Sequence, residues 1–80
     1  KLRPLEEYDH ANGTELVETC WAYYLNGFSI ADTADDLFIH RNTLQYRLKK
    51  IEELVSFPLS DYVELLDLIN CIYVKRMMYV

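Results

Sequence analysis

The sequence predicts an all-α fold, a small helical bundle of about five helices that contains a helix-turn-helix. Its 80 residues include only two Gly and two Pro, so long stretches are free of residues that break helices. Apolar residues recur three and four positions apart, which is the spacing of one buried helix face. Short joints separate these stretches. A chain of this length supports one core, so we expect residues 1–80 to form a single domain.

The first helix is predicted within residues 1–11, ahead of a break at Asn12-Gly13. Pro4 suits the first turn of a helix, where its missing N–H has no intrahelical partner. Leu5 and Tyr8 follow at helical spacing. This segment therefore predicts a short helix that buries one side.

The second helix is predicted to follow at once and to end at Asn26-Gly27. Either Asn12 or Thr14 can serve as its N-cap, with Glu15 as the capping-box partner of Asn12. The apolar positions expected to face the core are Leu16, Val17, Cys20, Trp21, Tyr24 and Leu25.

The third and fourth helices form the predicted helix-turn-helix over residues 29–54. Ser29 is expected to cap a helix of barely two turns. The apolar joint 38–40 connects it to a helix over residues 41–55, with His40 as the expected N-terminal cap. The expected inner face of the short helix consists of Ile30, Ala31, Ala34 and Leu37. The buried stripe of the longer helix consists of Leu44, Leu48, Ile51 and Val55.

The last helix is predicted over residues 61–79, after a break at Phe57-Pro58 and with Ser60 or Asp61 as its cap. It is apolar around most of its circumference, which is typical of a helix buried on more than one side. In so small a domain we expect the first helix, an upstream domain or a second subunit to pack against it.

Charge is distributed unevenly along the chain. The formal net charge of −5, taken alone, argues against nucleic acid as a partner. Residues 37–51, however, contain no Asp or Glu and carry +4, so the remaining residues carry −9. At about 100° per residue, the face of the fourth helix opposite its buried stripe presents Asn42, Gln45, Tyr46 and Lys49. Amides, hydroxyls and cations together are the groups that contact phosphates and base edges.

Other classes of function find little support in the sequence. No paired carboxylates, nucleophile–base pair or phosphate loop is visible, so we expect no enzyme, no catalytic residue and no cofactor. Cys20 and Cys71 have no Cys or His at metal-ligand spacing, so we expect two reduced thiols and no metal. The first residues show no basic region followed by an apolar one, so we expect no signal peptide, and the apolar stretch 65–80 contains charged residues. We therefore expect a cytoplasmic protein with no membrane partner.

The motif His40-Arg41-Asn42-Thr43-Leu44, followed by Tyr46-Arg47-Leu48, resembles the C-terminal helix-turn-helix domain of PucR-type (CdaR-like) bacterial transcription regulators. The resemblance covers roughly residues 2–70, and the turn with the helix after it also resembles the DNA-binding end of the Fis fold. Gln45 stands where the family often has Arg.

This resemblance implies sequence-specific binding of double-stranded DNA by the C-terminal module of a regulator, with an upstream sensing domain. It also implies a recognition helix over residues 41–55 in the major groove. We expect a homodimer or higher homo-oligomer that reads half-sites about 34 Å apart. The residues expected to contact DNA are His40, Arg41, Asn42, Thr43, Gln45, Tyr46, Arg47, Lys49 and Lys50. Residues in the first half of the helix are expected to contact bases. The residues expected to contact mainly phosphates are His40, Arg47, Lys49 and Lys50.

An alternative is a helical protein-interaction module that kept this fold and lost DNA binding. Its support is the net charge and the pair Asp35-Asp36 on the third helix, since that helix crosses the phosphate backbone in a helix-turn-helix. The third acid of the helix, Asp32, is explained by its place near the positive N-terminal end.

Overall fold

A computed structural model describes residues 1–78 and confirms the all-α prediction. Those residues form five helices and no strand. The helices are α1 (Arg3–Asn12), α2 (Leu16–Leu25), α3 (Ile30–Leu37), α4 (Arg41–Val55) and α5 (Tyr62–Met78). The bounds predicted for α4 are those observed. Position 79, the predicted last residue of the final helix, lies outside the described residues.

Three helix starts carry the caps that the sequence predicts. The Ser29 hydroxyl accepts the backbone N–H of Asp32 over 3.1 Å at the start of α3. His40 Nδ1 accepts the N–H of Asn42 over 3.0 Å at the start of α4. The Asp61 carboxylate accepts the N–H of Glu64 over 3.3 Å at the start of α5. Each cap supplies an acceptor for an N–H group without an intrahelical partner and fixes where its helix begins.

The cap predicted for α2 is wrong. Its N-cap residue is Glu15, whose side chain makes no capping hydrogen bond. Instead, the carboxylate of Asp9, from α1, accepts the N–H of Leu16 over 2.8 Å and that of Val17 over 3.0 Å. The Thr14 hydroxyl, predicted as a possible cap, donates to the same carboxylate over 2.5 Å. A residue of the preceding helix therefore caps α2 and holds α1 against it.

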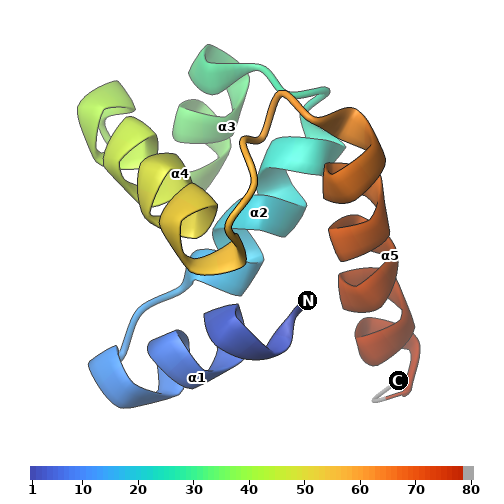
Figure 1. Ribbon diagram of the computed structural model, residues 1–80. Helices are drawn as coiled ribbons and strands as arrows, with labels where there is room; N and C mark the ends of the chain where they lie inside the picture. The colour runs from blue at the N-terminus through green and yellow to red at the C-terminus, as the bar shows by residue number, and fades with distance from the viewer. Residues whose placement is uncertain (79–80) are drawn as a thin grey trace.

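Helix α2 lies at the centre of the bundle and packs against α1, α3, α4 and α5 (Figure 1). Helices α4 and α5 lie on opposite sides of it, with α3 at one end of the bundle and α1 at the other. The side chains from α1, α4 and α5 that are almost completely enclosed are Leu5, Leu44, Ile51, Leu65, Leu68 and Ile72. Leu16 and Cys20 of α2 and Ala34 of α3 belong to the same cluster, so one core receives side chains from every helix.

The buried face of α2 agrees with the predicted one as far as Trp21 and departs from it after that residue. Leu16 and Cys20 are buried, and Val17 and Trp21 pack against the core. Leu25 is 62% exposed and Tyr24 is also exposed, whereas Thr19 and Ala22 are buried. The buried face is thus rotated toward small residues, which let α3 and α4 approach the helix closely. The inner face of α3 also differs from the predicted one, because Ala31 is exposed and Thr33 is buried instead. The Thr33 hydroxyl donates to the Ser29 carbonyl over 2.6 Å.

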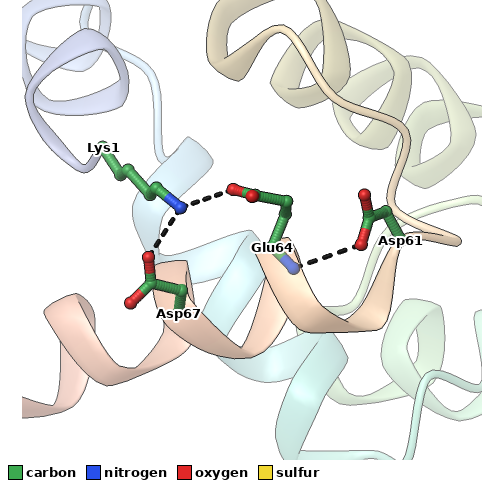
Figure 2. Close-up of polar contacts among 4 residues, drawn as sticks. All are labelled: Lys1, Asp61, Glu64 and Asp67. Atoms are coloured by element: carbon green, nitrogen blue, oxygen red, sulfur yellow. Dashed lines mark hydrogen bonds and ion pairs between the residues drawn. The ribbon is translucent and has the colours of Figure 1, made fainter.

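Ion pairs connect the N-terminal residue to α5. Figure 2 shows the Lys1 ammonium between the carboxylates of Glu64 and Asp67, with 2.6 Å between Lys1 Nζ and Asp67 Oδ2. The hydrogen bond to Asp67 raises the pKa of Lys1 above its ordinary value and lowers that of Asp67. Both side chains are well exposed, so this contact places the start of the chain beside α5 but contributes little to stability.

Two more ion pairs hold the C-terminal end of α5. Lys75 Nζ lies 2.8 Å from a carboxylate oxygen of Glu6 in α1. Arg76 Nη1 lies 2.7 Å from Glu18 in α2, and its guanidinium lies 5.1 Å from the centroid of the Trp21 ring.

None of the helices in residues 1–78 is long and apolar enough to cross a lipid bilayer.

Candidate nucleic-acid interface

The turn between α3 and α4 fixes how α4 is presented. Phe38, at the end of α3, has a left-handed backbone with φ of 56°. The N–H of Ile39 donates to the carbonyl of Ala34 over 3.0 Å, which closes the last turn of α3. Ala34 is buried, and Leu37 and Ile39 pack against the core. The predicted small and apolar residues of the helix-turn-helix therefore occupy the positions that hold the two helices together.

Most of the predicted DNA-contacting residues lie on one open side of α4. Leu44, Leu48 and Ile51 are buried, so the opposite face of the helix points away from the core. Tyr46 is 70% exposed, a high value for an aromatic residue. The other exposed members of the predicted set are His40, Arg41, Asn42, Thr43, Gln45 and Lys49.

Two exposed cations of this face have no intramolecular counter-charge. Neither Arg41 nor Lys49 forms an ion pair with any residue in the part of the chain that the structure describes. Arg41 stands at the start of α4 and Lys49 two turns further along. Both charges are therefore available to an anionic partner, and Gln45 lies between them in the sequence with an amide that can donate and accept.

Arg47 differs from these cations, because it also has a partner inside the domain. It is half-buried, and its Nη1 donates to the hydroxyl of Thr19 over 3.2 Å. Thr19 is completely buried in α2, and its hydroxyl donates in turn to the Glu15 carbonyl over 2.7 Å. A guanidinium has five N–H donors, so this single bond leaves others available for an external anion. The structure thus gives Arg47 a positioning contact that its place in the motif did not reveal.

Lys50 is also partly engaged. Its ammonium lies 5.0 Å from the centroid of the Tyr8 ring in α1 and 3.6 Å from a carboxylate oxygen of Glu53. The ring and the carboxylate together favour one position of a long and otherwise mobile side chain. Lys50 consequently carries less free charge than Arg41 or Lys49.

A pocket of about 460 Å³ separates α4 from the loop between α1 and α2. Thr43, Tyr46, Arg47 and Lys50 form the wall on α4. The opposite wall is formed by Tyr8 and residues 13–16. The position of Tyr8 and Thr14 beside the exposed face of α4 was not predicted from the sequence. The only local sign was the Asn12-Gly13 break, which indicates a loop but not its neighbour in space.

The acidic residues of α3 have different surroundings. Asp36 accepts a hydrogen bond from Asn26 Nδ2 over 3.2 Å, so it helps to hold the end of α2 against α3. Asp32 lies in the first turn of α3, where the positive end of the helix dipole stabilises a carboxylate. The side chain of Asp35 is exposed and makes no hydrogen bond or ion pair with the described residues. Of the three acids, Asp35 is the one whose role the fold does not explain.

The chemistry of the face is that of a binding surface. Residues 1–78 contain no group of three or more His, Cys, Asp or Glu side chains placed to hold a metal ion. The α4 face instead combines cations with amide and hydroxyl donors on one side of a rigid, capped helix. Such a face can neutralise phosphates and donate hydrogen bonds to base edges.

Comparison with known proteins identifies this arrangement. Residues 16–69 match the family described as the PucR C-terminal helix-turn-helix domain. The chain is 45% identical over 61 residues to the "Proline-responsive transcriptional activator PutR" of Bacillus subtilis (strain 168), covering 76% of the chain and 15% of that protein. It is 36% identical over 61 residues to the "Carbohydrate diacid regulator" of Escherichia coli (strain K12), covering 75% of the chain and 16% of that protein.

A third relative is the "Purine catabolism regulatory protein" of Bacillus subtilis (strain 168). It is 44% identical over 46 residues, which cover 58% of the chain and 9% of that protein. The chain spans about 15% of the length of the first curated relatives that it matches. No solved structure matches it significantly.

Proposed function

Because this chain belongs to the PucR C-terminal helix-turn-helix domain family, a family of transcription-regulator domains, we propose that it binds operator DNA sequence-specifically with α4 in the major groove. The observation that carries the proposal is the exposed face of α4, on which Arg41 and Lys49 have no counter-charge among the described residues. A helix of this kind, capped and backed by a core, is the element that enters the groove in helix-turn-helix proteins.

The contacts divide along α4. Arg41, Asn42, Thr43, Gln45 and Tyr46 are exposed in its first two turns and are assigned to bases or the sugars beside them. His40 and Lys49 reach phosphates on either side of the groove. Arg47 and Lys50 border the pocket beside the α1–α2 loop, so a phosphate that entered this pocket would meet both cations.

The proposed setting is a cytoplasmic bacterial regulator whose sensing domain lies upstream of this module. The relatives are named as regulators and are much longer than the matched segment, which supports a modular protein. The module has no proposed enzymatic activity. It acts as a homodimer or higher homo-oligomer and reads half-sites about one DNA turn, roughly 34 Å, apart.

The test is a titration against a duplex selected by this chain from a random pool, at several salt concentrations. With about four cations engaged, log affinity should fall against log salt with a slope of roughly −3.6. Replacing Arg41 and Lys49 together by Ala should lower the affinity at least about tenfold and reduce that slope by about 1.8. The variant should melt at the parent temperature, since neither side chain has an intramolecular ion pair.

The matched control is Arg3→Ala, which removes an exposed cation from α1. It should leave affinity within about twofold of the parent. Binding that the double variant retains, or binding that salt does not weaken, contradicts the proposal. A chain that selects no duplex at all favours the alternative, a protein-interaction module with this fold, for which exposed Asp35 is the supporting observation.

A further inference from the structure

Helix α5 has a second apolar face that the domain leaves mostly exposed, although Tyr73 at its edge stacks on the Trp21 ring of α2. Its core face consists of Leu65, Leu68, Ile69 and Ile72, all of which are buried. A separate row of residues at spacings of three, four, three and four is exposed: Val63, Leu66, Asn70, Tyr73 and Met77. Val63 is 81% exposed. A row of apolar side chains left in water on a folded domain marks a surface that binds something.

The spacing of this row identifies the kind of partner. Alternating steps of three and four are the a and d positions of a seven-residue repeat, by which one helix packs along another. The row contains no charged residue, and its only polar member is Asn70. That residue occupies an a position, where an Asn paired with its counterpart sets register and oligomeric state in helix pairs. The Asn70 side chain makes no hydrogen bond to any described residue.

We propose that this face pairs α5 in parallel with α5 of a second copy of the chain, about a two-fold axis that runs along the pair. In this arrangement each residue of the row lies against its own counterpart. The apolar members therefore meet apolar members, and the two Asn70 amides meet each other.

The exposed area is sufficient for such a pair. The row and its neighbour Val74 leave roughly half or more of each apolar side chain in solvent. Together they offer on the order of 600 Å² per copy, so pairing would bury about 1,200 Å² in total, the lower end of specific interfaces. We therefore expect a reversible dimer, with a dissociation constant in the range of about 1 to 100 μM.

This pairing also leaves the DNA-binding face open. Helix α5 lies on the opposite side of α2 from α4 (Figure 1), so a contact between two α5 helices covers neither recognition helix. The inference gives a surface to the dimer of the proposed function, and its relevance to DNA rests on that function. Self-association itself can be measured without DNA.

The first experiment is sedimentation equilibrium of the chain from about 1 μM to about 1 mM. The mass of the parent should rise toward twice 9.5 kDa. Val63→Glu with Met77→Glu should stay monomeric and keep the helical circular dichroism of the parent, since both side chains are exposed. The matched control, Ala11→Glu with Phe38→Glu, adds the same charge at exposed positions away from α5 and should dimerise like the parent.

A second experiment locates the contact. Asn70→Cys in a Cys71→Ser background should be joined to a second copy by a short bismaleimide, because the two-fold axis brings position 70 against itself. Asp35→Cys in the same background should not be joined, since α3 does not pack against α5. A parent that remains monomeric at about 1 mM, or equal crosslinking at positions 70 and 35, overturns the pairing. Neither result depends on DNA binding, so failure of the pairing and failure of the proposed function are distinguishable.

Discussion

Arg47 of α4 donates a hydrogen bond to the buried hydroxyl of Thr19 in α2, with 3.2 Å between Nη1 and Oγ1. This bond ties the basic face to the central helix, so Arg47 holds the orientation of the face to which it belongs. The proposed phosphate contact of Arg47 and its structural contact use different N–H groups of one guanidinium.

Arg47 and Arg41 are consequently expected to respond differently to replacement by Ala. Arg47→Ala removes a hydrogen bond from a charged donor and should lower the free energy of unfolding by about 1 to 2 kcal/mol, as well as weakening DNA binding. Arg41→Ala should weaken binding without changing stability, because Arg41 has no ion-pair partner in residues 1–78. Urea unfolding and fluorescence anisotropy with duplex DNA measure the two quantities. Equal stability of both variants would show that the bond to Thr19 contributes nothing.

Among the exposed and half-buried acidic side chains of the domain, that of Asp9 is expected to contribute most to stability. It accepts three hydrogen bonds, from the N–H groups of Leu16 and Val17 and from the Thr14 hydroxyl. Asp9→Ala should therefore cost about 2 kcal/mol of unfolding free energy, the upper end of the range for helix caps. Glu7→Ala, on the exposed side of the same helix, should change it by less than about 0.5 kcal/mol. Thermal and urea unfolding of the two variants provide the comparison.

Replacing Phe38 by Gly is expected to stabilise the domain. Its backbone φ is 56° and its side chain is 95% exposed, so it bears the strain of a left-handed backbone and makes little apolar contact in return. Phe38→Gly should raise the free energy of unfolding by up to about 1 kcal/mol, because Gly adopts this conformation without strain. Phe38→Ala keeps the Cβ and should be close to neutral. If both variants are destabilised to the same extent, the ring makes a contact that outweighs the strain.

The two cysteines should differ in reactivity. Burial raises the pKa of the Cys20 thiol to about 12, whereas Cys71 is half-exposed. At about pH 8 iodoacetamide should therefore modify Cys71 in the folded domain and leave Cys20 intact, while both react in urea. Above the ordinary thiol pKa, the Cys20 thiol keeps its proton in the folded state and loses it in the unfolded chain. Stability should thus decline as the pH rises above the ordinary thiol pKa of about 8.5. Mass spectrometry of peptides after timed labelling identifies the modified thiol.

The helix-turn-helix was predictable because its determinants lie close together in the sequence. Ser29 and His40 each accept an N–H within three residues of themselves, and the buried stripe of α4 follows a simple helical period. The whole candidate face of α4 then follows from knowing which side is buried. The family motif added the expected chemistry of that face.

Contacts between distant segments were not predictable in the same way. Asp9 reaches across a loop to α2, and nothing in the local sequence distinguishes it from any other surface acid. Arg47 lies at the edge of the buried stripe, where a cation can point either inward or outward. The exposure of Leu25 depends on how α2 is rotated among four neighbours, which small residues such as Thr19 and Ala22 determine.

The central position of α2 has a consequence for how the domain opens. Every other helix packs against α2, so no other helix can keep its place in the bundle once α2 has unfolded. Opening of α2 is then equivalent to global unfolding, and its amide protons should exchange with solvent only as rarely as the whole chain unfolds. Helix α5, by contrast, packs on α2 alone among the helices, whereas α1 and α3 also pack on α4. Separation of α5 would expose its core residues Leu65, Leu68 and Ile72 but would leave the contacts among the other four helices in place. The amides of α5 should exchange sooner, and the difference measures how much free energy holds that helix in place.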